Sequence, residues 1–473
     1  MYDVVIGIEI HLELMTATKM FSSAPYAFKK NVNTCVNEVD IASPGTLPSV
    51  NKEAVRKAIQ ACTALHLQID PLLRFDRKNY YYSDLPKGYQ ITQQFHPIGS
   101  QGYLDIETSQ GQRRIGIERI HLEEDTAKQF HVQNRTLIDY NRAGVPLIEL
   151  VSKPDIRSGE EAALYVEKIQ KTMEYLGVSD AKMEEGSMRC DINISLKEAG
   201  SSAFGTKVEI KNLNSVANIS AAITYEIARQ GALLDAGEKI IQETRRYDEA
   251  STSTVSMRKK EGSVDYKYFP EPNIFPIRLA PAFIKEIVEH MPELPDEKAR
   301  RFSCEYQLSE YDIQVLLNNR EMCCFFEECL RFSKAAKTIC NYLTTDISGL
   351  LTKQEMRLAD SKLQAKHLAK LADMVEQNTI SSKQAKDLLP GLLEGNDPQK
   401  LAQEKGMEQV SDESVIREMV LAVIAENPQS VSDFKNGKTH VQGFLVGQVM
   451  KRSKGKANPR LAASLVAAEL AKC

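Results

Sequence analysis

Near the start of the chain, apolar residues alternate with other residues. Every second residue from Val4 to Leu14 is apolar, and the positions between them include Glu9, His11 and Glu13. Successive side chains of an extended strand point to opposite faces, so this pattern predicts a β-strand with one apolar and one polar face. Carboxylate and imidazole groups then follow one another at intervals of about 7 Å along the polar face.

Two later segments, residues 189–196 and 207–211, repeat this alternation. If the three strands belong to one sheet, their acidic side chains meet on one face, where a divalent cation relieves their repulsion. Oxygen ligands suit Mg²⁺, and neighbouring lysine or arginine suits phosphate, a combination typical of phosphoryl transfer. The candidate ligands are Glu9, His11, Asp191 and Glu209, and the candidate phosphate contacts are Arg189, Lys207 and Lys211. The pattern fits equally well three solvated faces with cross-strand ion pairs.

The patterns along the rest of the chain predict three domains. Residues 1–292 mix strands with helices, whereas 293–400 and 401–473 have helical spacing only and differ in charge. The change of pattern falls at Pro292-Glu293-Leu294-Pro295. We therefore expect an α+β domain with a mixed or antiparallel sheet, then an all-α domain, then a small all-α tail.

One helix of the first domain has clear boundary signals. Ser158 is followed by Glu161 at the spacing of a capping box, and Gly177 supplies the residue type that ends many helices. A helix is therefore expected between Ser158 and Gly177.

Two further features each have two interpretations. The run Glu123-Glu124-Asp125 follows a predicted strand. In one interpretation it adds one more metal ligand, and in the other it is an acidic strand end in solvent. In one interpretation the tyrosine-rich loop over residues 80–89 stacks on a nucleobase, and in the other its rings are simply half-buried.

Composition is that of a soluble globular protein. Of the 473 residues, 42% are hydrophobic and 26% charged, and the formal charge is -4. No apolar run approaches the ~20 residues that cross a bilayer. Nine irregularly spaced cysteines, and Asp3 where a secretory signal has lysine or arginine, favour reduced thiols in the cytoplasm. We expect a cytoplasmic protein without membrane contact.

The tail carries the clearest nucleic-acid signal. From Lys435 to Arg460 the chain has seven lysine or arginine residues and no acidic residue. In an otherwise acidic chain, such a strip predicts contact with a phosphate backbone. The candidate contacts are Lys451, Arg452, Lys454, Lys456 and Arg460.

Several catalytic motifs are absent from the sequence. It contains no P-loop, no dinucleotide-binding glycine pattern after a strand, no Gly-x-Ser-x-Gly elbow and no amidase-type nucleophile segment. Any ATP must therefore bind on an open sheet surface.

Six segments carry long and specific motifs: Val5–His11, Phe75–Tyr80, Asn141–Glu149, Lys182–Asp191, Glu209–Ser215 and Tyr266–Pro272. They resemble the B subunit of the glutamyl/aspartyl-tRNA amidotransferase, and the resemblance covers essentially the whole chain. It implies a cradle-shaped catalytic domain, a helical domain and a tail similar to the small YqeY proteins.

The resemblance also implies an activity, the ATP-dependent amidation of Glu-tRNA(Gln) and, in many organisms, Asp-tRNA(Asn). Mg-ATP phosphorylates the side-chain carboxylate, and ammonia from a glutaminase A subunit displaces the phosphate in a heterotrimer completed by a small C subunit. At matching positions the implied metal ligands are Glu9, His11, Glu124, Asp191 and Glu209. The alternative is a non-catalytic scaffold that delivers tRNA, which only the tail supports by itself.

Overall fold

The computed structural model describes residues 2–26, 30–259, 265–407, 413–435, 441–453 and 457–472. The chain forms two compact units, Met1–Pro295 and Asp296–Cys473. The first combines a large sheet with helices, and the described part of the second is helical, which confirms the predicted fold class. The division lies at the proline-containing segment where the sequence pattern changes. The further boundary near residue 400 stays a prediction.

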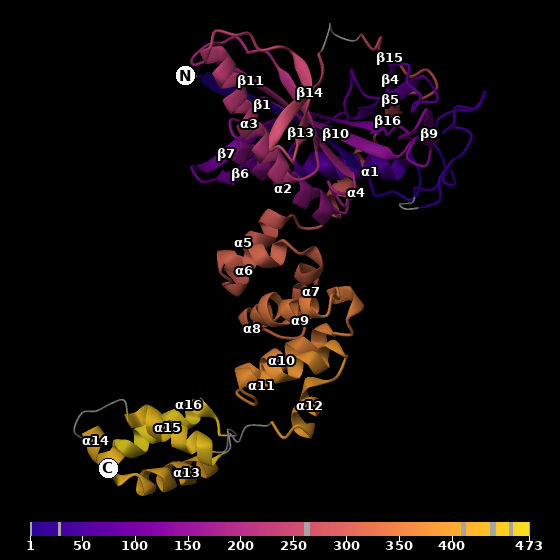
Figure 1. The fold of residues 1–473 in the computed structure, drawn as a ribbon. Helices are drawn as coiled ribbons and strands as arrows, with labels where there is room; N and C mark the ends of the chain where they lie inside the picture. The colour runs from indigo at the N-terminus through magenta and orange to yellow at the C-terminus, as the bar shows by residue number, and fades with distance from the viewer. Residues whose placement is uncertain are drawn as a thin grey trace. The chain divides into compact units, whose positions relative to one another are not determined.

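Within the described residues, a nine-stranded sheet forms the centre of the first unit (Figure 1). Its strand order is β14-β13-β12-β11-β1-β10-β7-β6-β2; β12 and β13 are parallel, and the other neighbours are antiparallel. The bounds are β1 Tyr2–Glu13, β2 Gln68–Ile69, β6 Gly99–Thr108, β7 Gly111–Glu124, β10 Pro146–Ser152, β11 Met188–Glu198, β12 Val208–Leu213, β13 Glu243–Asp248 and β14 Ser253–Lys259. The three strands predicted from their alternation, β1, β11 and β12, are thus consecutive in the sheet.

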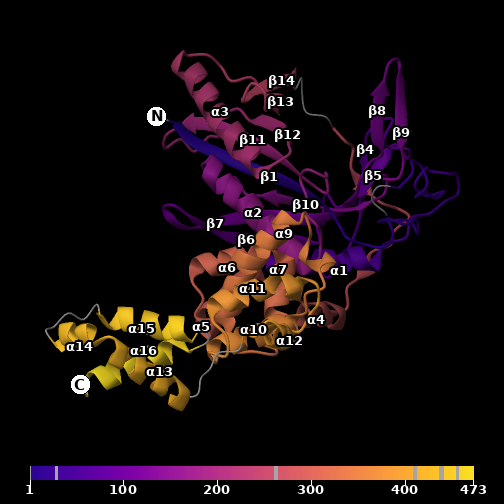
Figure 2. The same ribbon diagram turned by 60° about the horizontal axis from the view of Figure 1, so that its bottom comes forward.

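Helices cover the apolar face of this sheet. Alternate residues of β1, such as Ile8 and Ile10, are buried and share one core with α1 (Lys52–Ala64), α2 (Gly159–Leu176) and α3 (Val216–Asp235). Figure 2 shows α2 and α3 side by side against the strands. Because side chains alternate along a strand, burial of this face leaves the charged residues of β1 on the opposite face.

Helix α2 begins and ends where the sequence predicts. The Ser158 side chain accepts a hydrogen bond of 3.1 Å from the N–H of Glu161, and Gly177 follows the helix with a φ of 66°. The carboxylate of Glu161 accepts from the N–H of Arg157, at 2.8 Å, rather than from that of Ser158. Local sequence therefore fixes both ends of this helix.

Smaller elements complete the first unit. They are the sheet β15-β4-β5 (Phe269–Pro270, Asp76–Asn79 and Tyr89–Thr92), the pair β16-β3 (Ile277–Arg278 and Leu72–Leu73), the hairpin β8-β9 (Lys128–Val132 and Arg135–Asp139) and α4 (Pro281–Glu289). In Figure 2 the hairpin extends away from the large sheet. The pairing of β4 with β15 joins two segments that are about 190 residues apart in the chain.

The described part of the second unit consists of helices. The first group is α5 Pro295–Tyr306, α6 Glu310–Leu317, α7 Arg320–Leu330, α8 Ala336–Asn341, the π-helix η1 Tyr342–Ile347, α9 Ser348–Lys353, the 3₁₀-helix η2 Leu358–Asp360, α10 Ala365–Glu376, α11 Ser382–Leu393 and α12 Pro398–Glu404. The tail helices are α13 Glu413–Glu426, α14 Pro428–Lys435, α15 Val441–Arg452 and α16 Pro459–Leu470. The tail has a hydrophobic core of its own, which includes Ile416, Leu445 and Leu465.

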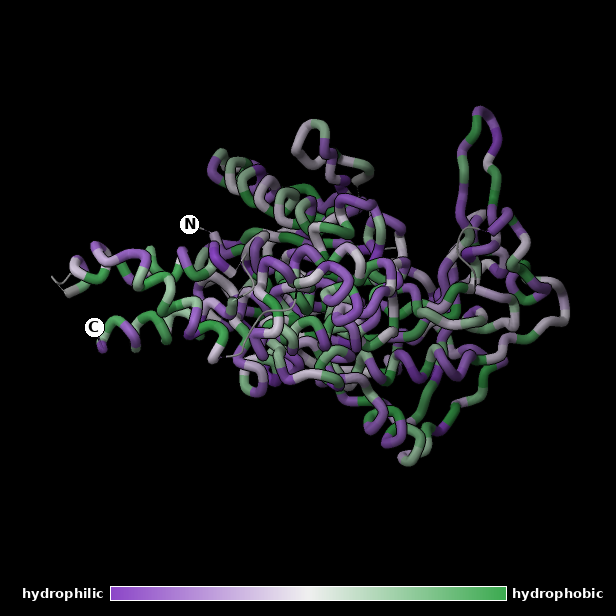
Figure 3. Tube along the Cα trace, turned by 90° about the horizontal axis from the view of Figure 1, so that it is seen from below, coloured by the Kyte–Doolittle hydropathy of each residue, from purple (hydrophilic) through white to green (hydrophobic). Residues whose placement is uncertain are grey.

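Among the residues that the structure describes, no helix is both long enough and apolar enough to span a membrane. Hydrophilic and hydrophobic positions intermingle along the chain in Figure 3. Apolar positions of the helices in the first unit and in the tail contribute instead to the cores described above.

A buried ion pair anchors the loop that follows β1. Lys19 is fully buried, and its Nζ donates to Asp40 Oδ2 and to the carbonyl of Tyr140, both at 3.1 Å. Asp40 also accepts from the Ser22 hydroxyl at 2.7 Å and from the N–H of Asn37 at 3.0 Å. Both members of the pair therefore have further hydrogen-bond partners, and the pair ties this loop to the segment around Tyr140.

We expect Lys19→Met to lower the free energy of unfolding of the first unit by about 3–5 kcal/mol, because it leaves the Asp40 carboxylate buried without its cation. Calorimetric unfolding measures the loss. Lys182→Met is the matched control, since Lys182 pairs with Glu185 at 3.4 Å on the surface, where a pair contributes about 0–1 kcal/mol. Equal losses in the two variants would contradict the anchoring role.

Candidate active site

The polar face of the large sheet gathers ionisable side chains from four adjacent strands. His11 of β1 lies opposite Glu149 of β10, which in turn lies opposite His121 of β7. On the other side of β1, Glu9 lies opposite Asp191 of β11. Opposed residues of antiparallel strands point to the same face, so the backbone register brings these groups together.

Two imidazoles and two carboxylates form a compact group on this face. His11 Nε2 lies 3.1 Å from Glu149 Oε2 and 3.6 Å from Glu123 Oε1. His121 Nε2 lies 3.6 Å from an oxygen of each of the same carboxylates. Among the described residues, His11, Glu123 and Glu149 are the group whose ligand atoms all lie within 4.8 Å of one another. One imidazole and two carboxylates fit a divalent cation.

The close approach of these groups shifts the pKa values of His11 and Glu149. Burial lowers the pKa of His11, but the hydrogen bond to Glu149 and the charges of Glu149 and Glu123 outweigh it and raise the pKa to about 9. Burial raises the pKa of Glu149, yet the positive charges of His121, His11 and Lys78 bring it below its ordinary value. Glu149 is thus charged and in close contact with the imidazole of His11.

A second acidic group lies on the same face, toward β12. Glu9 accepts a hydrogen bond of 2.9 Å from Asn193, and burial, with the charges of neighbouring carboxylates, raises the pKa of Glu9. Lys211 pairs with Asp191, and its Nζ lies 3.4 Å from Glu209 Oε1. Three predicted ligands, Glu9, Asp191 and Glu209, therefore come from three consecutive strands, with Lys211 bound to two of them.

The other predicted phosphate contacts differ in their surroundings. Arg189 pairs with Asp125 and lies 3.9 Å from Glu13 Oε1, so acidic residues of the protein already bind its guanidinium. Lys207 is exposed, directly precedes β12, and acts electrostatically on Glu9. Of the two, Lys207 presents its charge to solvent and Arg189 holds Asp125.

Glu124 lies apart from the compact group. Its carboxylate pairs with Lys87 and accepts a hydrogen bond of 3.0 Å from the N–H of Ile91. Because neighbours along a strand point to opposite faces, Glu123 turns toward His11 and Glu124 turns away from it. The resemblance implied Glu124 as a ligand, whereas the geometry brings Glu123 to that position.

The predicted tail contacts are exposed where the structure describes them. Lys451 and Arg452 end α15, and Arg460 lies at the start of α16. Arg452 forms an ion pair of 2.8 Å with Glu426 of α13, so its charge is partly offset. Lys454 and Lys456 lie outside the described residues.

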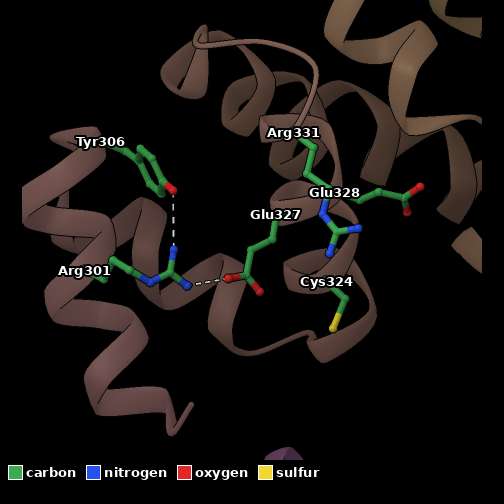
Figure 4. Close-up of a pocket in the computed structure, with 6 residues that line it drawn as sticks. All are labelled: Arg301, Tyr306, Cys324, Glu327, Glu328 and Arg331. Carbon is green, nitrogen blue, oxygen red and sulfur yellow. Dashed lines mark hydrogen bonds and ion pairs between the residues drawn. The ribbon is translucent and has the colours of Figure 1, made fainter. Parts of the chain in front are cut away.

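A separate pocket of about 450 Å³ lies in the second unit (Figure 4). Arg301 of α5 donates to the Tyr306 hydroxyl at 3.4 Å and pairs with Glu327 of α7, and Cys324 and Arg331 line the same hollow. The pocket holds no metal-ligand group among the described residues. The polar face of the sheet is therefore the candidate active site.

Glu149 and His121 were not among the residues predicted from the sequence, and Glu123 was not singled out from its acidic run. Glu149 has a local signal, because it is the single charged residue of the apolar strand β10, whereas His121 lies in a strand with several other charged residues and has none. Their importance depends on β10 lying between β1 and β7, a long-range pairing that alternation alone does not specify.

The chain matches two protein-family models. The GatB/GatE catalytic domain matches residues 4–285, and the GatB domain matches residues 324–470. The B subunit of the aspartyl/glutamyl-tRNA(Asn/Gln) amidotransferase from Geobacillus thermodenitrificans is 48% identical over 473 residues, which cover 100% of this chain and 99% of the relative. The proteins of the same name from Staphylococcus carnosus and Limosilactobacillus fermentum are 47% and 45% identical, over 100% and 99% of this chain and 99% of each relative. Since both the domain matches and the full-length relatives agree, the chain belongs to the family of aspartyl/glutamyl-tRNA(Asn/Gln) amidotransferase B subunits.

Proposed function

We propose that this chain is the subunit of a tRNA-dependent amidotransferase on which amidation takes place. The substrate is glutamate on tRNA(Gln), aspartate on tRNA(Asn), or both, with ATP as the co-substrate. The observation that carries the proposal is the group of His11, Glu123 and Glu149 on the polar face of the sheet, in a chain of this family. The tRNA-delivering scaffold is not favoured, because a scaffold does not need such a group.

The reaction requires activation, because a carboxylate does not react with ammonia at neutral pH. One oxygen of the side-chain carboxylate attacks the γ-phosphorus of ATP, so that an acyl phosphate forms and ADP leaves. Ammonia then attacks the carbonyl carbon, an amide forms, and phosphate leaves with the proton that the nitrogen gives up. Positioning and charge neutralisation supply most of the catalysis in such a transfer.

The donor set supports a divalent cation held by His11, Glu123 and Glu149, and oxygen donors on the same face favour Mg²⁺. Glu9, Asp191 and Glu209 provide further oxygen ligands beside it. A bound Mg²⁺ would offset the negative charge of the ATP phosphates. We propose Glu123 in place of Glu124 as the ligand from the acidic run, since Lys87 and the Ile91 N–H already bind Glu124.

The basic residues around this face have separate roles in the proposal. Lys207 and Lys211 orient the phosphates of ATP, because a lysine ammonium attracts phosphate oxygens as a point charge. Arg189 fixes Asp125 through their ion pair, and it contacts phosphate only if that pair opens.

Amidation needs a source of ammonia, and the sequence has no amidase-type nucleophile. We therefore propose that a glutaminase A subunit supplies ammonia and that a small C subunit completes a heterotrimer. Because the substrate is a charged tRNA, we place the complex in the cytoplasm.

The first test is ATP turnover by the purified complex. We expect ADP to form only when Glu-tRNA or Asp-tRNA is present, because its side-chain carboxylate is the phosphoryl acceptor. Uncharged tRNA is the control. ATP turnover that is the same with charged and uncharged tRNA, or no turnover at all, would contradict the proposed activity.

The second test separates two adjacent glutamates. We expect Glu123→Gln to weaken Mn²⁺ binding to the complex by at least about 10-fold, because it removes a ligand. Glu124→Gln is the matched control and leaves Mn²⁺ affinity unchanged, since Glu124 faces Lys87. Titration of each complex with Mn²⁺, followed by electron paramagnetic resonance, measures both. The reverse order of effects would restore Glu124 as the ligand.

The third test concerns the tail. We expect Lys451→Ala to reduce the slope of log affinity for tRNA against log salt concentration by about 1, because one phosphate contact is lost. Arg452→Ala changes this slope less, since Glu426 already offsets the charge of Arg452. Filter binding at several salt concentrations measures the slopes. An unchanged slope for Lys451→Ala would remove this residue from the tRNA contact.

A further inference from the structure

Two motifs far apart in the sequence meet beside the compact group. Strand β4 pairs with β15, and the N–H of Asn79 donates to the carbonyl of Tyr266 at 3.0 Å. The Asn79 side chain also donates to the carbonyl of Lys267 at 2.7 Å. These bonds place Tyr266 next to β4, which carries Lys78, and next to Tyr80, which directly follows β4. The rings of Tyr80 and Tyr266 lie 5.9 Å apart, centre to centre.

Two neighbouring cations of β4 have different partners. The Arg77 guanidinium binds both oxygens of Glu271, at 2.6 and 3.0 Å. In the described part of the chain, Lys78 forms no ion pair with a carboxylate. Its Nζ lies 5.1 Å from the centre of the Tyr266 ring and 5.9 Å from that of the Tyr80 ring. Aromatic faces attract an ammonium without neutralising its charge.

The ammonium of Lys78 interacts electrostatically with the carboxylates of the proposed metal site. Glu123 and Glu149 attract the Lys78 ammonium electrostatically, although neither forms a direct ion pair with it. Lys78 therefore lies near the carboxylates that we assign to the cation. Lys211, in contrast, is bound to Asp191 and Glu209 of the protein itself.

We propose that Lys78 binds an anionic oxygen of the substrate and that Tyr80 and Tyr266 position its ammonium. The oxygen belongs either to the side-chain carboxylate of the tRNA-bound amino acid or to a phosphate of ATP. A half-buried ammonium held by rings, rather than by a carboxylate, keeps its charge for such a ligand. The inference rests on the proposed function and adds a substrate-binding residue to it.

The test uses the assembled complex and measures amidation kinetics together with equilibrium binding of ATP alone. We expect Lys78→Met to reduce kcat/KM for amidation by about 100-fold, and Lys78→Arg to retain part of the activity because it keeps the charge. Lys52→Met is the matched control and leaves both measurements unchanged. Its Nζ lies 5.2 Å from the centre of the Phe283 ring, with helix α1 on the opposite side of the sheet from the acidic groups.

The two sources of the anionic oxygen give different results. If Lys78 binds ATP, Lys78→Met weakens ATP binding in the absence of tRNA. If it binds the amino-acid carboxylate, ATP binding is unchanged and the loss appears in kcat or in the KM for Glu-tRNA. The proposal would be overturned if the activity and the ATP binding of Lys78→Met both equalled those of the wild type. It would also be overturned if Lys78→Met and Lys78→Arg lost activity equally and both had lowered thermal stability.

The tyrosine rings provide a second route if Lys78→Met does not fold. Tyr266→Phe keeps the aromatic face and retains activity, whereas Tyr266→Leu removes the face and reduces kcat/KM. Equal activities of these two variants would overturn the positioning role. Wild-type ATP turnover without charged tRNA would instead overturn the proposed function, so the two failures are distinguishable.

Discussion

The central constraint on this structure is that β1 must satisfy opposite demands on its two faces. One face is packed against α1, α2 and α3 in the core, and the other carries Glu9 and His11. A shift of one residue in the pairing of β1 would move those polar groups into the core and the apolar residues into solvent. The burial of one face therefore fixes the register of the other, and rigid strands position the ionisable groups that a site for catalysis requires.

This arrangement concentrates carboxylates, and several of them lie against a basic side chain of the protein, whereas Glu9 accepts a hydrogen bond from the neutral amide of Asn193. Lysine or arginine binds Asp191, Asp125 and Glu124. Glu123 and Glu149 are different, because the nearest basic groups to their carboxylates are the imidazoles of His11 and His121. An imidazole can ligate a metal, whereas lysine and arginine offer only donors in their charged forms. The group with histidine is thus the part of the described face where a divalent cation can displace the proton of His11, instead of competing with a lysine or an arginine for the carboxylates.

How far the sequence predicts this site depends on the range of each interaction. Alternation predicts β1, β11 and β12 and their shared face, and the boundary residues of α2 predict both of its ends, because these signals are local. The position of β10 between β1 and β7, which brings Glu149 to His11, is long-range and has no local signal. The choice between Glu123 and Glu124 depends on the register of β7 at its last residue, where periodicity is least informative.

The lysines on and beside the polar face differ in whether a carboxylate of the protein already neutralises them, and this difference affects how readily each can bind an anionic substrate. Lys211 can bind a phosphate only in competition with Asp191 and Glu209, so the loss of its existing ion pairs reduces the net free energy of phosphate binding. Lys78 is held by the faces of Tyr80 and Tyr266, which lose little when an anion approaches the ammonium. A site that must bind a carboxylate or phosphate, react and release its product therefore benefits from one cation that the protein orients without neutralising. The pairing of β4 with β15, two segments about 190 residues apart, holds this cation in place beside the polar face.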